Sequence, residues 1–117
     1  MKDDLKPFLP LSPATLHILL ALAADDLHGY AIMQEVARQS SGQYKLGPGT
    51  LYENLDKLVA RTLVKRVSSP SASDDPRRRY YRLTQLGRRV LLVDVERLKT
   101  VVREAKVHLP VAEASGS

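Results

Sequence analysis

The apolar residues of this chain change their spacing twice, and the order of those changes restricts the fold more than any other feature. Three short segments have the spacing of a helix with one buried face, and two short runs rich in β-branched and aromatic residues follow them. The helical spacing then returns for roughly 24 residues, about twice the length of an average globular helix. We therefore expect a mainly α-helical fold with one small β-hairpin and a long C-terminal helix.

The first two helices are marked by the residues at their ends. Ser12 can cap the first helix, with Pro13 at the first helical position, where a missing N–H costs little. Four apolar residues are expected to form the buried face of that helix: Leu16, Leu19, Leu20 and Ala23. A second helix is expected from about Gly29 to Arg38, and the Ser-Ser-Gly sequence at 40–42 should end it.

The third helix should have two distinct faces. Gly47 and Pro48 suit its start, and a leucine stripe should be buried: Leu51, Leu55 and Leu58. A polar stripe beside it follows a 4-3-4 spacing and comprises Thr50, Asn54, Lys57 and Arg61. Because this spacing matches the helical repeat, the polar side chains should line up on one exposed side of the helix.

Two strand candidates follow, at 63–67 and 80–83, and the segment between them is rich in Ser, Asp and Pro, which favours a loop. Three consecutive arginines, Arg77, Arg78 and Arg79, lie beside the second strand. From residue 57 to residue 89 there are ten Lys or Arg side chains and two acids, a net charge of +8. The whole chain carries +5, so the remainder carries −3. The positive charge is therefore concentrated in one region, as expected for a surface that meets an anionic partner.

Three helices followed by a β-hairpin is the order of a winged helix-turn-helix, whose third helix enters the major groove of DNA. The hairpin, or wing, would lie beside it and contact the phosphate backbone. Eight residues are candidates for DNA contact: Thr50, Tyr52, Asn54, Lys57, Arg61, Arg77, Arg78 and Arg79. Taken alone, the polar stripe could be an ordinary solvated helix face and the arginines an exposed charge run. Tyr52 lies between the buried and exposed stripes, so it could contact a phosphate or fill a gap between helices.

The last helix can begin after Thr84, which is a suitable cap. Its apolar residues have a heptad-like spacing and form a seam that we define as Leu91, Val95, Leu98, Val102 and Ala105. A helix of this length extends about 35 Å, which is too long for a three-helix body to cover. We expect the seam to form a homodimer interface, antiparallel or crossed, although in a monomer it could fold back on the first helix.

These features divide the chain into four segments. We expect an N-terminal arm at 1–11, a winged helix-turn-helix DNA-binding domain at 12–83, a dimerisation helix at 84–109 and a disordered tail at 110–117. A two-fold dimer would present two recognition helices, so its operator in double-stranded DNA should be a near-palindrome.

Three segments resemble the signature segments of the PadR family of transcriptional regulators. They are LHGYAIMQEV at 27–36, GPGTLYENLDKLVARTLV at 47–64 and RRRYYRLTQLGRRVL at 77–91, in the order and spacing of that family. The resemblance covers about residues 12 to 92 and matches the shorter members, which have a single C-terminal helix. It implies a homodimeric winged-helix repressor whose C-terminal helix makes most of the dimer contact. It also implies that a small aromatic or other apolar effector releases the DNA, as in some relatives.

The chain departs from the family pattern at Thr62, where relatives often have glycine between the recognition helix and the first wing strand. A left-handed turn there would be strained for threonine. Glu53 lies near the DNA-facing stripe, where a carboxylate would repel phosphate unless it accepts from a cytosine amino group. We expect it instead to turn away and pair with Lys57 at i+4. Tyr30 is expected to pack at the start of the second helix.

The composition excludes several classes of protein. There is no cysteine, so disulfides and thiolate metal sites are excluded, and His17, His28 and His108 lack the spacing of a metal site. No nucleophile motif or phosphate-cradling glycine loop is present, so we expect no enzyme activity and no cofactor. No apolar run is long enough to span a membrane and the N-terminus lacks a signal peptide, so we expect a soluble cytoplasmic protein.

Two other functions remain open from the sequence. A winged helix can be a protein-interaction module that binds DNA weakly and without sequence preference. The chain could also be a ligand sensor that binds DNA weakly at rest, with an apolar cavity between the C-terminal helices and the first helix of a dimer. Aromatic residues make up 5% of the chain, so stacking on a flat ligand would have to involve Phe8 or the tyrosines.

Overall fold

The computed structural model describes residues 4–69 and 77–109. The expected loop at 68–76 falls mostly outside these residues, and the expected tail at 110–117 falls wholly outside them. The elements, in chain order, are a 3-10 helix η1 (Lys6–Phe8), α1 (Pro13–Ala24), β1 (Leu27–His28), α2 (Gly29–Gln39), α3 (Pro48–Ala60), β2 (Val64–Val67), β3 (Tyr80–Leu83) and α4 (Gln85–His108). The helices and the two wing strands agree closely with the sequence prediction.

The sheet has three antiparallel strands in the order β1-β3-β2, so the predicted hairpin of β2 and β3 carries one further strand. Val64 pairs with Leu83 across the hairpin, and Leu27 pairs with Tyr81 on the other side of β3. β1 contains only two residues, too few to produce an alternating pattern that sequence analysis could detect. Its effect is to connect the base of the wing to the start of α2, which begins directly after it.

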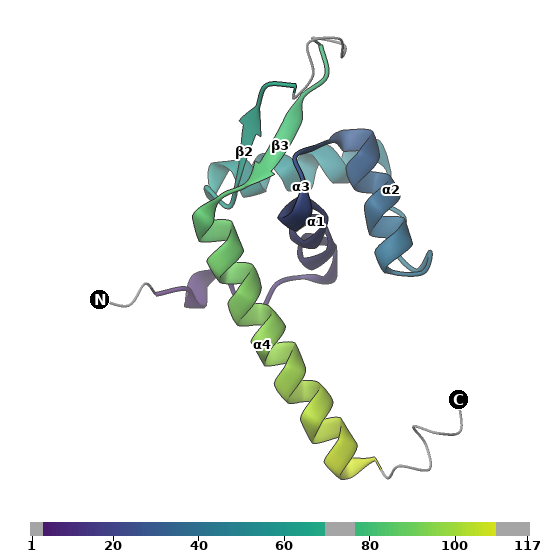
Figure 1. The fold of residues 1–117 in the computed structure, drawn as a ribbon, viewed down its shortest axis with the longest axis vertical. Helices are drawn as coiled ribbons and strands as arrows, with labels where there is room; N and C mark the ends of the chain where they lie inside the picture. The colour runs from purple at the N-terminus through teal and green to yellow at the C-terminus, as the bar shows by residue number, and fades with distance from the viewer. Residues whose placement is uncertain (1–3, 70–76, 110–117) are drawn as a thin grey trace.

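Helix α1 occupies the centre of the body, with α2, α4 and the sheet around it (Figure 1). Ile18, Leu19 and Leu22 are fully or almost fully buried. The predicted face is therefore only partly correct, because Leu16 and Leu20 are half-buried at its sides. A helix that is covered on several sides has no single apolar stripe. Assuming one buried face therefore assigns some of the wrong residues to the core.

The predicted caps of α1 and α4 are confirmed. Ser12 Oγ accepts a hydrogen bond from the Thr15 N–H at 3.2 Å, and Thr84 Oγ1 accepts one from the Gly87 N–H at 2.9 Å. Gly87 packs so closely on the α3–β2 turn that a β-carbon there would meet the Leu63 carbonyl oxygen and lie 2.8 Å from a Leu83 methyl group. The cap and this close approach fix where α4 leaves the wing.

The C-terminal end of α3 shows how the chain accommodates threonine at position 62. Thr62 has a positive φ of 62°, and the two hydrogen bonds of a Schellman motif form around it. The Thr62 N–H donates to Val59 O and the Leu63 N–H donates to Leu58 O, both at 3.0 Å. The turn is therefore left-handed, with a β-branched residue in a backbone region that favours glycine.

Helix α4 has the predicted cap and the predicted length of 24 residues. Its first half packs on the body, and its second half extends beyond it (Figure 1). No helix in the described ranges is both long and apolar enough to cross a membrane.

Candidate nucleic-acid interface

The polar stripe of α3 lies where the sequence placed it. Leu51, Leu55 and Leu58 are buried in the core, whereas Thr50 and Lys57 are exposed and Asn54 is half-buried. Asn54 Nδ2 donates a hydrogen bond to the Thr50 backbone carbonyl at 2.9 Å, which orients the amide along the helix surface. Among the described residues, the amide oxygen and the second N–H of Asn54 have no hydrogen-bond partner, so both can serve other partners.

Arg61, at the end of the same stripe, is engaged by the N-terminal arm. Its Nη2 donates to the Pro7 carbonyl at 3.0 Å, and its guanidinium carbon lies 4.7 Å from the centroid of the Phe8 ring. Leu5, Phe8, Leu9 and Leu11 are partly buried against the core. Residues 5–11 are thus packed on the body, and Arg61 would have to leave these contacts to reach DNA.

Glu53 is exposed on α3, and among the described residues it makes no ion pair with Lys57, so the expected i+4 pair is wrong. The ion pair that involves α3 instead joins Asp56 to Arg66 of β2, with Oδ1 and Nη2 3.0 Å apart. This pair connects the recognition helix to the first wing strand.

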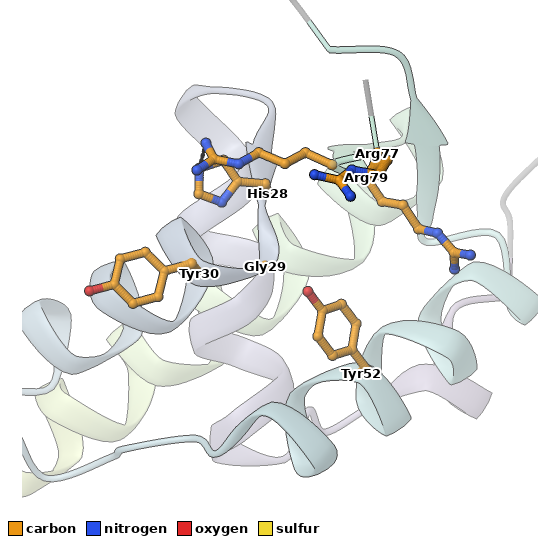
Figure 2. Close-up of a pocket in the computed structure, with 7 residues that line it drawn as sticks. His28, Gly29, Tyr30, Tyr52, Arg77 and Arg79 are labelled. Carbon is orange, nitrogen blue, oxygen red and sulfur yellow. Dashed lines mark hydrogen bonds between the residues drawn. The ribbon is translucent and has the colours of Figure 1, made fainter. Parts of the chain in front are cut away.

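The three wing arginines lie beside the starts of α2 and α3. Arg77, Arg78 and Arg79 are exposed, and together with four residues of β1, α2 and α3 they line an open pocket of about 470 Å³. The other lining residues are His28, Gly29, Tyr30 and Tyr52 (Figure 2). The pocket therefore brings Tyr52 together with the three arginines, four of the eight predicted DNA-contacting residues.

The two tyrosines of this pocket lie differently. Tyr30 is 62% exposed and its ring points away from Gly29, so the expectation that it packs at the start of α2 is wrong (Figure 2). Tyr52 is 42% exposed, and its hydroxyl points towards Gly29 and the wing. A β-carbon at position 29 would meet the Tyr52 hydroxyl and lie 2.8 Å from its Cζ, so glycine is required for the ring to lie there.

His28 was not identified as a site residue from the sequence, but it caps α2. Its Nδ1 accepts from the Ala31 N–H at 3.3 Å, and its Nε2 lies 3.2 Å from Nη1 of Arg78. The ring also meets Tyr80 edge-on at a centroid distance of 5.3 Å. A neutral imidazole has one acceptor nitrogen, so it serves either the cap or Arg78 at any moment.

An ion pair fixes the base of the wing to the end of α1. Arg82 donates to both carboxylate oxygens of Asp26, at 3.0 Å from Nε to Oδ1 and 2.8 Å from Nη2 to Oδ2. This hydrogen bonding lowers the pKa of Asp26 below its ordinary value of 3.8. Burial opposes the effect, and the charges of Arg82 and Lys65 reinforce it. The charged pair fixes the position of β3, and the three arginines that precede this strand line the pocket.

A second open pocket, of about 410 Å³, lies between the N-terminal arm and the end of α3. Phe8, Leu9, Leu11, Leu58 and Leu63 contribute apolar lining. Two cationic residues of the polar stripe, Lys57 and Arg61, also line it. This pocket therefore adjoins the end of the predicted DNA-contacting surface.

The residues of the predicted dimer seam differ in how far they are buried in their own chain. Leu91 is only 5% exposed and lies in the core of its own chain, and Val95 packs partly against that core. Leu98 and Ala105 are half-buried, and Val102 is 53% exposed. Only the distal part of the seam is therefore available to a second molecule.

No group of three or more metal-ligating side chains occurs in the described part of the chain.

Comparison with known proteins gives consistent matches. The family model described as "Transcriptional regulator PadR-like family" matches residues 18–92. The Transcriptional regulator Rv3488 of Mycobacterium tuberculosis is 39% identical over 89 residues, which cover 76% of this chain and 78% of that protein.

Two solved structures share the fold. A PadR family transcription regulator from Clostridium difficile R20291 is 24% identical with a TM-score of 0.71, and the match covers 85% of this chain and 100% of that one. A PadR-like transcriptional regulator from Bacillus cereus is 19% identical with a TM-score of 0.70, and the match covers 90% of this chain and 94% of that one.

Proposed function

Because the chain belongs to the PadR-like family of transcriptional regulators, we propose that it binds a near-palindromic operator in duplex DNA as a homodimer and represses transcription. The proposal assigns the chain to the cytoplasm, where bacterial operators are found. The observation that carries it is that Tyr52 of α3 and the three wing arginines line one pocket. One side chain of the recognition helix therefore meets the wing, while Asn54, Lys57 and Arg61 lie on its other flank, and a duplex that binds both must span the exposed face of α3 between them.

In this proposal the candidate DNA-contacting residues of the polar stripe and the wing divide into two groups. Thr50 and Asn54 carry the hydrogen-bonding groups nearest the start of α3, the part of a recognition helix that contacts base edges. Lys57 and the wing arginines neutralise phosphates, so they contribute affinity that depends on salt and not on sequence. Arg61 joins the second group when it leaves Pro7 and Phe8.

Fluorescence anisotropy with a duplex from the protein's own promoter and a scrambled duplex, at several salt concentrations, tests the proposal. We expect tight binding to the first duplex, weaker binding to the second, and a steep loss of both with salt. Equal and feeble binding to both would contradict it and favour the interaction module or the resting ligand sensor.

Two substitutions separate base contact from phosphate contact. Asn54→Ala should cost about 1–3 kcal/mol on the promoter duplex and little on the scrambled one. Lys57→Gln should weaken binding to both duplexes similarly and reduce the slope of log affinity against log salt concentration by about 1. Lys99→Gln is the matched control, because Lys99 is exposed on α4 and paired with Glu96. A large effect of the control would mean that net charge alone governs binding.

The homodimer is supported by the exposed distal part of α4, which needs an apolar partner, and a second copy supplies an identical one. Repression would follow from covering a promoter. A reporter under that promoter should rise when the gene is deleted, whereas a fall would indicate an activator.

A releasing ligand would occupy the pocket beside Phe8. Its walls are apolar and its rim carries Lys57 and Arg61, so a small apolar or aromatic ligand there would compete directly with DNA for those cations. The expected cavity at the dimer interface remains a second location. Phe8→Ala should abolish ligand-induced release without preventing DNA binding, and release that survives this change would favour the interface.

A further inference from the structure

The pocket between α2 and the wing has a chemical character that differs from that of the polar stripe. Among the described residues that line it, three of the seven are arginines and none is an acid. The other four are His28, Tyr30, Tyr52 and Gly29, the first residue of α2 (Figure 2). These groups are donors to an anion, because guanidinium has no acceptor and a phenol O–H donates readily to a charged oxygen.

We propose that this pocket holds one backbone phosphate of the bound duplex, that Tyr52 donates its hydroxyl hydrogen bond to that phosphate, and that Gly29 is the residue that positions Tyr52. The inference rests on the proposed function and assigns Tyr52 to the DNA backbone and not to a base. Gly29 becomes a positioning residue for DNA binding although it has no side chain to contact DNA.

The orientation of Tyr52 supports the assignment. Its hydroxyl points back towards Gly29 and the wing arginines, away from the helix surface that a base edge would approach (Figure 2). Within residues 4–69 and 77–109 this hydroxyl has no hydrogen-bond partner, although it shares the pocket with three cationic side chains. A phosphate oxygen between the phenol and a guanidinium would receive charge-assisted hydrogen bonds from both.

The start of α2 adds a smaller contribution. The first-turn amides of a helix lack intrahelical partners and carry partial positive charge. His28 already caps the Ala31 amide through Nδ1, so the side chains, and not this amide, must provide most of the binding. If a phosphate draws Arg78 away from Nε2 of His28, the single acceptor nitrogen of His28 remains committed to the cap.

The open shape of the pocket favours a phosphodiester over a free ion. A volume of about 470 Å³ is much larger than a phosphate, and a duplex backbone can lie across an open pocket with its sugars outside. Free inorganic phosphate offers the same oxygens without the neighbouring contacts of the duplex, so it should bind much more weakly.

The test uses the full chain and promoter duplexes that carry one neutral methylphosphonate linkage, moved along each half-site in turn. Tyr52→Phe should reduce affinity about tenfold for promoter and scrambled duplexes alike, as loss of one hydrogen bond to a charged group predicts. When the neutral linkage replaces the phosphate that occupies the pocket, at symmetric positions in the two half-sites, wild type should bind the duplex about tenfold more weakly. Tyr52→Phe should cause no further loss of affinity on that duplex.

Gly29→Ala tests the positioning role. Alanine is a better helix former than glycine, so helix content should be retained, while the added β-carbon displaces the Tyr52 ring. We expect the same loss as Tyr52→Phe, and no additional loss when the two changes are combined. Tyr44→Phe is the matched control, because Tyr44 is a partly exposed tyrosine outside this pocket, and its affinity should equal that of wild type.

The outcomes distinguish this inference from the proposed function. If wild type binds no duplex, the proposed function fails. If wild type binds but Tyr52→Phe and every methylphosphonate act additively, the phosphate site is refuted and DNA binding stands. A loss of wild-type affinity in inorganic phosphate at constant ionic strength, absent in Tyr52→Phe, would overturn the duplex assignment in favour of a free-phosphate site.

Discussion

The two halves of α4 carry apolar residues at the same spacing but lie in opposite surroundings. In the first half, Val90 and Leu91 are buried in the core of their own chain, and Gly87 packs against Leu63. In the second half, Val101 and Val102 are each more than half exposed, and so is Leu109, which follows the end of the helix. One continuous pattern therefore has two outcomes: its first half builds the body, and its second half leaves apolar side chains exposed.

Asp94 lies at the boundary between these halves. It is fully buried, its Oδ1 accepts from Arg97 Nε at 2.7 Å, and its Oδ2 has no hydrogen-bond partner in the described residues. A buried carboxylate that depends on one partner makes this turn of the helix intolerant of change. The comparison thus separates residues whose loss unfolds the body from residues whose loss affects assembly.

The largest expected effect is that of Leu91→Ala. Removing a buried leucine side chain should lower the free energy of unfolding by about 2–5 kcal/mol. Urea unfolding at several protein concentrations should show this loss at every concentration. Val102→Ala should instead weaken only the concentration-dependent part of the stability. If both variants lost the same stability at every concentration, the two halves of α4 would not have different roles.

Val102→Glu should have the next largest effect, because it places a charge in the proposed dimer interface. We expect the dimer dissociation constant to rise at least tenfold, about 1.4 kcal/mol, with unchanged helix content. Val107→Glu is the matched control. Val107 is 76% exposed, and five residues along a helix place it on nearly the opposite side from Val102. Dissociation by both variants would indicate a general charge effect.

Thr62→Gly should stabilise the body by about 0.5–1 kcal/mol, because glycine adopts a φ of 62° without the steric cost that threonine carries. Thermal unfolding of a Val102→Glu background would measure this on the body alone. Thr62→Ala, which removes the side chain beyond Cβ but keeps the strained conformation, should not stabilise. A gain from alanine equal to that from glycine would refute the strain.

The smallest expected effect is the loss of the stability that the Asp26–Arg82 pair contributes, as the pH falls. The pKa of Asp26 is lowered in the folded protein, so its pair with Arg82 contributes stability above the ordinary value of 3.8 and loses it as the pH falls through the folded value. Asp26→Asn should therefore be slightly less stable than wild type at pH 7, and the difference should shrink as the pH falls below 3.8 and vanish once it is below the lowered folded pKa. A difference that persists in acid would mean that shape, not charge, holds the wing base.

Sequence patterns predicted most of this fold because helix caps and the leucine stripe of α3 are local. Ser12, Thr84 and the Gly47–Pro48 start all act within one turn of their helix. β1 could not be predicted, since two residues form a strand only because β3 lies beside them. The packing of Phe8 under Arg61 joins residues far apart in the chain and leaves no periodic signal.

The site was predictable only in part for the same reason. The polar stripe follows from helical geometry, and the arginines follow from composition. The contact of Tyr52 with Gly29 and the cap provided by His28 depend on how α2, α3 and the wing meet. The position of Leu91 shows a further limit, because heptad spacing does not distinguish a partner helix from the chain's own core.

In the proposed assembly the distal half of α4 joins two copies, so that two recognition helices meet one operator. Multi-angle light scattering at micromolar concentration, with and without the promoter duplex, would measure this assembly. We expect about 26 kDa for the free protein, twice the chain mass of 13.0 kDa, and two chains per duplex. A free mass of about 13 kDa together with one chain per duplex would contradict the claim.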